Sequence, residues 1–163
     1  MNSLERYMTK NQSSFGIRLF ADGETVGALE LVLFNASNKR QGFFSLEAQV
    51  ADKIRVNQKP LAKGTIVHLQ TLLVQSGIHQ LTEYESDAPL TINGIEYAVL
   101  DGMAYRLEII SSGKTYCVNR YHRCESGFAM LYNAIIRACL CDEFPSDIAS
   151  YFHCSASEWD PVA

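Results

Sequence analysis

The sequence predicts an α+β fold, in which an antiparallel sheet is packed by a central helix and by a largely buried C-terminal helix. Two observations carry this prediction: apolar and polar residues alternate over several short runs, and two later segments keep apolar residues at helical spacing. With 163 residues, the chain is long enough to bury one sizeable core. We therefore expect a single globular domain over 1–163, in which 1–14 and 155–163 are the poorly ordered parts.

The strongest alternation begins at Phe44. From there to Val56 apolar residues occupy even positions and polar residues occupy odd ones, which is the period of a half-buried strand. Asp52 interrupts the apolar face, so we expect a bulge or an exposed strand end there. Earlier, two β-type runs over 15–19 and 25–34 flank an Asp22-Gly23 turn and predict an N-terminal hairpin.

A second group of strands is predicted in the C-terminal half. The runs 95–100, 105–110 and 115–121 are separated by an Asp101-Gly102 pair and by the turn 111–114. Such punctuation predicts a three-stranded antiparallel meander.

Helices are predicted between and after these strands. Apolar residues at helical spacing favour a helix over 65–76 that ends at Gly77, although its β-branched start would also suit a strand. A second, mostly apolar helix is predicted over 128–141, with Ser126 as its N-cap and a position across the apolar face of the meander. A further short helical turn is expected over 146–152.

Composition restricts the class of protein. The formal charge of −4 argues against a general nucleic-acid binder, which normally carries a basic face. The first residues lack the apolar run of a signal peptide, and no segment has the ~20 apolar residues of a membrane span. We therefore expect a soluble, cytoplasmic protein whose five cysteines are free thiols, and we expect no cofactor.

All five cysteines lie in the last third of the chain, together with two of the four histidines. Thiolates and imidazoles bind zinc, but these spacings match none of the usual zinc motifs. The commoner role of an unligated cysteine is that of a small buried hydrophobe, so we expect no metal site. If one exists, its candidate ligands are Cys117, His122, Cys124, His153 and Cys154.

A catalytic thiol is the second hypothesis for this segment. Cys124 precedes a predicted helix start, where the helix dipole stabilises a thiolate, and His122 is a nearby base. Such proximity in a loop guarantees no useful geometry, and His68, His79 or His153 would serve equally well from elsewhere in the fold. An ordinary loop cysteine is therefore the preferred interpretation.

An anion site is the third hypothesis. Arg120 and Arg123 supply guanidinium groups, and Ser126 marks a helix start whose backbone N–H groups favour phosphate or carboxylate. Glu125 counts against this site. The alternative is a solvated connection whose arginines pair with surface carboxylates.

Motifs of common enzymes are absent: the sequence contains no phosphate-binding P-loop, nucleophile elbow, H-E-x-x-H pair or dinucleotide-binding turn. Aromatic residues, in contrast, are available as interface anchors. We therefore expect a non-catalytic, cytoplasmic protein-binding domain, as an inhibitor or a toxin-neutralising immunity protein for a basic partner. A thiol- or metal-dependent enzyme and a small-anion-sensing regulatory domain remain the alternatives. The expected contact residues are Tyr84, Tyr97, Tyr105 and Trp159.

Overall fold

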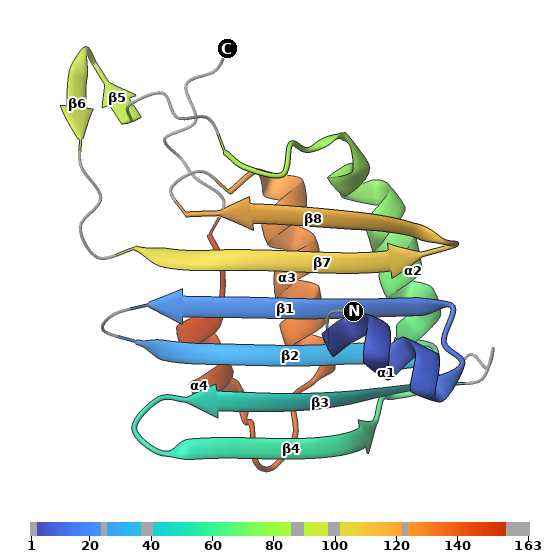
Figure 1. Cartoon of the computed structure of the whole chain (residues 1–163). Helices are drawn as coiled ribbons and strands as arrows, with labels where there is room; N and C mark the ends of the chain where they lie inside the picture. Colours follow the sequence, from blue (N-terminus) through green and yellow to red (C-terminus); the bar gives the residue numbers. More distant parts are fainter. Residues whose placement is uncertain are drawn as a thin grey trace.

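The computed structural model describes residues 3–23, 26–36, 41–85, 90–97, 102–121 and 124–155. These residues form a six-stranded antiparallel sheet in the order β4-β3-β2-β1-β7-β8, together with four α-helices (Figure 1). The predicted α+β class is confirmed. The main elements are α1 (Ser3–Asn11), β1 (Phe15–Gly23), β2 (Gly27–Asn35), β3 (Gly42–Gln49), β4 (Lys53–Pro60), α2 (Thr65–Gln75), β7 (Met103–Ser111), β8 (Lys114–Arg120), α3 (Ser126–Ala138) and α4 (Ser146–Ala149).

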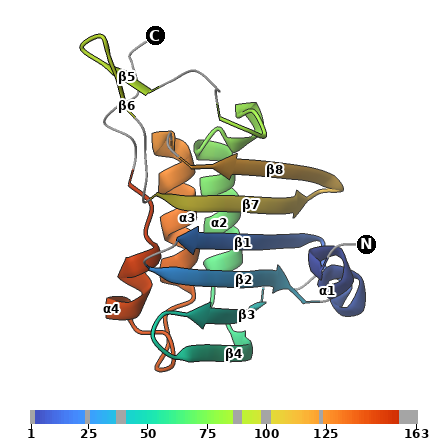
Figure 2. The ribbon, with the colours of Figure 1, turned by 60° about the vertical axis from the view of Figure 1, so that its left-hand side comes forward.

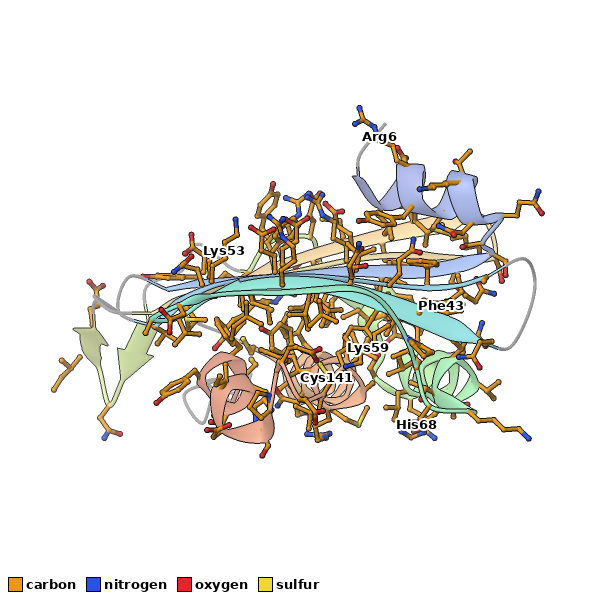
Figure 3. All side chains as sticks on the ribbon, turned by 90° about the horizontal axis from the view of Figure 1, so that it is seen from below. Arg6, Phe43, Lys53, Lys59, His68 and Cys141 are labelled. Carbon is orange, nitrogen blue, oxygen red and sulfur yellow. The ribbon has the colours of Figure 1, made fainter. Side chains whose placement is uncertain are left out.

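The helices divide unequally between the two faces of the sheet. Helices α2, α3 and α4 cover one face, called the inner face here, and α1 lies on the opposite, outer face (Figures 2 and 3). Alternate residues of each strand point to the inner face, so Ile17 and Leu19 of β1 belong to the main core. The outer face includes Arg18 and Phe20, which alternate with these two residues. Outside the area covered by α1, this face carries polar side chains.

The predicted strand over 44–56 is divided into two strands, β3 and β4, which pair with each other. Asp52 lies in the turn between them and is exposed. An irregularity in the pairing occurs at the other end, between Phe44 and Leu46 of β3. Opposite it, Gln58 adopts a positive φ of 44° and its N–H donates to the Ser45 hydroxyl at 2.9 Å.

The N-terminal hairpin is confirmed as β1–β2, but Asp22 and Gly23, the predicted turn, are the last two residues of β1 and pair with Ala28 and Gly27. The three-stranded meander is wrong in one strand. β7 and β8 form the expected hairpin, whereas β6 (Ile95–Tyr97) pairs with β5 (Leu90–Ile92) in a separate two-stranded sheet. Residues 98–101 lie outside the described part of the chain. The second neighbour of β7 is β1, because Leu107 and Ile109 opposite Leu19 and Ile17 continue one apolar face across the sheet.

The predicted central helix is confirmed as α2, and Gly77 beyond its end has the left-handed φ of 67°. Helix α3 packs closely against it: a Cβ on Gly127 would lie 2.1 Å from the Ser76 carbonyl oxygen. Glu125, not Ser126, occupies the N-cap position of α3, with no side-chain capping hydrogen bond. The helix ends at Ala138, so Cys139 and the residues after it lie outside the helix that was predicted to continue to 141.

Helix α1 has no counterpart among the predicted elements, because 1–14 were expected to be poorly ordered. Its apolar residues Leu4 and Met8 are buried against Val32 and Phe34 on the outer face. Gly16 permits this contact, because a Cβ there would lie 2.6 Å from the Met8 sulfur. The i, i+4 spacing of Leu4 and Met8 is the signal that predicts such a helix.

The short helical turn predicted over 146–152 is confirmed as α4 followed by a 3₁₀ turn at Ser150–Phe152. None of the helices in the described ranges is long and apolar enough to cross a membrane. A 3₁₀ turn at Ile78–Gln80 follows α2 and leads into residues 82–85, which reach the edge of β8.

Candidate functional site

The fold brings together two of the five cysteines, Cys124 and Cys154. Their residues are 4% and 3% exposed, and the Cys154 thiol donates to the Ser155 carbonyl oxygen at 3.7 Å. The neighbouring Cys124 side chain, and after it burial, raises the pKa of Cys154. All five cysteines are free.

Two neighbouring side chains hold the backbone of His153 and Cys154 in place. Asn133 of α3 donates from Nδ2 to the Cys154 carbonyl oxygen at 2.6 Å, and its Oδ1 accepts from the Cys154 N–H at 2.8 Å. The Tyr105 hydroxyl donates to the His153 carbonyl oxygen at 3.4 Å. Tyr105 also packs edge-on against Tyr132, with ring centroids 5.0 Å apart. Burial raises the pKa of both phenols, and the Tyr132 hydroxyl has no hydrogen-bond partner in the described part of the chain.

The remaining cysteines lie apart from this pair. Cys117 is on β8, where Asn119 contacts its sulfur at 3.8 Å, and burial raises its pKa. Cys139 is fully buried at the end of α3. Cys141 follows α3 and forms a β-bridge with Phe144.

The metal and nucleophile hypotheses gain no geometric support from the described residues. Within 3–23, 26–36, 41–85, 90–97, 102–121 and 124–155, no group of three or more His, Cys, Asp or Glu side chains is arranged to hold a metal ion. His122 lies outside these ranges. Cys124 is nearly inaccessible, and the three described imidazoles, His68, His79 and His153, are exposed. A catalytic pair requires its nucleophile and base within hydrogen-bond reach.

Arg120, the first anion-site candidate, already donates its hydrogen bonds to other groups of the protein. Its side chain is 1% exposed, and Nε and Nη2 donate to the Glu125 carboxylate at 2.8 and 2.9 Å. Nη1 donates to the backbone carbonyl oxygens of Thr82 at 3.0 Å and Asn119 at 2.7 Å. Ser126 is exposed at the start of α3, and Arg123 lies outside the described residues. The Arg120 contacts therefore fasten the end of β8 to α3 and to residue 82.

A cleft of about 480 Å³ opens at the end of the sheet where β1, β7 and β8 meet residues 84–85. Tyr84 forms a parallel bridge with Asn119, and Asn119 donates its N–H to the Glu83 carbonyl oxygen at 2.7 Å. The segment therefore lies along the β8 edge. We call this hollow the β8 cleft; it is lined by Phe20, Asp22, Tyr84, Glu85, Ala104, Tyr105, Arg106, Asn119, Arg120 and Tyr121.

The charges in the β8 cleft are partly neutralised within the protein. Arg106 donates from Nη2 to Glu108 Oε1 at 2.7 Å, as Arg120 does to Glu125. The guanidinium of Arg18 lies over the Phe20 ring, 4.1 Å from its centroid. Asp22 is exposed at the end of β1, and the described part of the chain contributes no hydrogen bond or ion pair to its carboxylate.

The predicted contact residues differ in their exposure and in their position relative to the β8 cleft. Tyr84 is 65% exposed and lines the β8 cleft. Tyr105 also lines it but is half-buried against Tyr132. Tyr97 belongs to β6, with a side chain that is not described, and Trp159 lies outside the described residues. Phe20 and Asp22 were not predicted as contact residues; the signal for them is their place on the polar side of an otherwise apolar alternation.

Comparisons with protein-family models, with curated proteins and with solved structures find no match to this chain.

Proposed function

We propose that this protein is a non-catalytic protein-binding domain and that the β8 cleft is its contact site. The observation that carries the proposal is the grouping of aromatic and charged residues from β1, β7, β8 and residues 84–85 around one open hollow. Aromatic rings and arginines are enriched at the centres of protein interfaces, where a few buried anchors supply most of the binding energy.

The aromatic residues of the cleft suit an inserted side chain. Tyr84 is largely exposed and has only two side-chain torsions to fix, so binding costs it little conformational entropy. Phe20 forms a half-buried aromatic surface nearby. A volume of about 480 Å³ accommodates a long side chain together with part of its backbone.

Charge favours a basic partner. Arg106 and Arg120 are paired with Glu108 and Glu125, so their positive charges are largely compensated. Asp22 is left as an exposed carboxylate at the rim. A lysine or arginine from the partner would pair with Asp22 and lie against an aromatic face, while the net charge of −4 would favour its approach. These features support an inhibitor of a basic protein, including a toxin-neutralising immunity protein.

The proposal is tested by affinity chromatography on extracts of the source cells with immobilised wild-type protein and variants. We expect a basic protein to be retained by the wild type and lost from Asp22→Lys and from Tyr84→Ala. Asp147→Lys is the matched control, because Asp147 is equally an exposed carboxylate but lies on α4, away from the cleft lining. Equal retention by all four proteins, or retention of acidic proteins only, contradicts the proposal.

A further inference from the structure

We propose that Asn93 is a modification site of this protein, at which the side-chain amide is lost by reaction with the backbone and with water, and aspartate and isoaspartate are formed. The proposal is independent of the β8 cleft, because the reaction needs no partner protein. It rests on the residue that follows Asn93, on the exposure of both residues and on the size of the hairpin that contains them.

Asn93 and Gly94 form the only Asn-Gly pair of the sequence. Deamidation begins when the backbone nitrogen of the following residue attacks the carbonyl carbon of the asparagine side chain. A side chain on that following residue obstructs the approach, and glycine has none. Among the asparagines of the chain, Asn93 is therefore the one with the least hindered neighbour.

The two residues occupy the turn of the β5–β6 hairpin, between the paired residues Ile92 and Ile95. Their φ values are 50° and 79°, and a type I′ turn requires a positive φ at both positions. Both residues are exposed, and a Cβ at Gly94 would have no atom of a non-adjacent residue within 4 Å. The described part of the chain provides no hydrogen bond to the Asn93 amide. The surroundings of the pair therefore leave the amide and the attacking nitrogen open to water.

The small size of the hairpin makes the reaction geometry accessible. β5 and β6 have three residues each and form a sheet of their own. A two-stranded hairpin is marginally stable by itself, so it opens more readily than the six-stranded sheet. The rotation that brings the Gly94 nitrogen to the Asn93 side chain requires only this local opening.

The chemistry balances in two steps. The Gly94 nitrogen forms a bond to Asn93 Cγ and loses its proton, the bond from Cγ to Nδ2 breaks, and ammonia leaves with that proton. A cyclic imide remains. Water then opens the imide at either of its two carbonyl carbons, which gives aspartate or isoaspartate. In total, one water is consumed, one ammonia is released, and nothing is oxidised or reduced.

The two products differ in their effect on the hairpin. Each adds a carboxylate to the exposed turn, so the protein becomes more negative. Aspartate keeps a normal main chain, and Asp-Gly suits a type I′ turn as Asn-Gly does. In isoaspartate the main chain runs through Cβ and Cγ and is one atom longer. Because the longer loop does not fit the pairing of Ile92 with Ile95, we expect isoaspartate to open the hairpin.

The test follows the wild-type protein during incubation at mildly alkaline pH, by peptide mapping and mass spectrometry. Asn57 is the internal control, because it is also exposed but is followed by Gln58. We expect conversion at Asn93 to be at least about tenfold faster than at Asn57. Labelling by an isoaspartate-specific methyltransferase should mark the peptide that contains position 93. A synthetic peptide of residues 90–97 gives the rate of the open chain, because so short a hairpin is not stable alone.

Asn93→Gln is the matched variant. It retains an exposed amide, but attack by the next backbone nitrogen would have to close a larger ring, which forms more slowly. The variant should lose the methyltransferase label and leave conversion at Asn57 unchanged. The proposal is overturned if Asn93 stays intact in the folded protein after the peptide has been fully converted. It is equally overturned if the label persists in Asn93→Gln, because isoaspartate would then arise at another position, such as the Asp22-Gly23 pair.

Discussion

The guanidinium of Arg120 and the carboxylate of Glu125 form a bidentate pair, with Nε 2.8 Å from Oε2 and Nη2 2.9 Å from Oε1. The arginine side chain is 1% exposed, whereas the glutamate is 36% exposed. The pair therefore joins the last residue of β8 to the N-cap of α3. It also neutralises the positive charge of the buried Arg120 guanidinium.

Glu125→Ala should destabilise the fold by about 3 kcal/mol, because it leaves the buried Arg120 guanidinium without its counter-ion. Urea unfolding measures this loss. Arg55→Ala is the matched control, since Arg55 pairs with Glu47 at 3.2 Å but is 68% exposed, and its loss should cost about 0.5 kcal/mol or less. Equal effects of the two substitutions would show that the burial of Arg120 has no energetic weight.

Gly127→Ala should destabilise the fold by about 2 kcal/mol or more, because the new Cβ would meet the Ser76 carbonyl oxygen at 2.1 Å and push α2 and α3 apart. Ser126→Ala is the neighbouring control: this side chain is exposed and does not occupy the N-cap position, so its removal should be nearly neutral. Thermal unfolding of both variants decides the point. A fully stable Gly127→Ala protein would contradict the close packing of the two helices.

Tyr132→Phe should leave the stability within about 0.5 kcal/mol of wild type or increase it, because the buried hydroxyl has no hydrogen-bond partner among the described residues. Tyr132→Ala, in contrast, should cost about 3–5 kcal/mol, because it removes a fully buried ring that stacks on Phe128. Chemical denaturation separates the two contributions. A loss above about 1 kcal/mol in Tyr132→Phe would reveal a partner for the hydroxyl.

Lys59 and Glu143 should make stability sensitive to acid. Lys59 Nζ lies 2.8 Å from Glu143 Oε2, near the Cys141 loop on the helix side of the sheet (Figure 3). The hydrogen bond from Lys59 lowers the pKa of Glu143 from 4.5 to about 2. Because the folded pKa is lower than the unfolded one, the pair's contribution is complete above pH 4.5 and is lost as the pH falls towards 2.

The difference in Tm between wild type and Lys59→Met should therefore shrink over this acid range. Both partners are exposed, so the difference at neutral pH should already be small. NMR titration of the Glu143 carboxyl group gives the pKa directly, and a value near 4.5 in the wild-type protein would contradict the pairing.

The strands could be predicted from the sequence because alternation is a local property: Phe44, Leu46 and Ala48 reach the core by the period of the strand alone. The pairing of β7 with β1 could not, because hairpin signals identify neighbours in sequence and say nothing about the other edge of a strand. The proximity of Cys124 and Cys154 could not be predicted from the sequence for the same reason. It depends on Asn133 docking a distant segment, which the positions of the cysteines in the sequence do not encode.

The β8 cleft was only partly foreseen. Tyr84 was expected as a contact residue from its type, but the hollow itself exists because residues 84–85 lie along the edge of β8. That contact depends on the backbone hydrogen bond from Asn119 to Glu83 and on the hydrogen bond from Arg120 to the Thr82 carbonyl oxygen. Neither contact leaves a periodic pattern in the sequence.

The measurement that tests the central proposal most directly is photo-cross-linking in the source cells, with p-benzoylphenylalanine in place of Tyr84. Tyr151 is the matched control position, because it is similarly exposed at 58% but follows α4 and is not part of the cleft lining. We predict a discrete adduct with a basic protein from position 84, which is absent from position 151 and is lost when Asp22→Lys is added. No adduct at position 84, or the same adducts from both positions, would contradict a binding site in the β8 cleft.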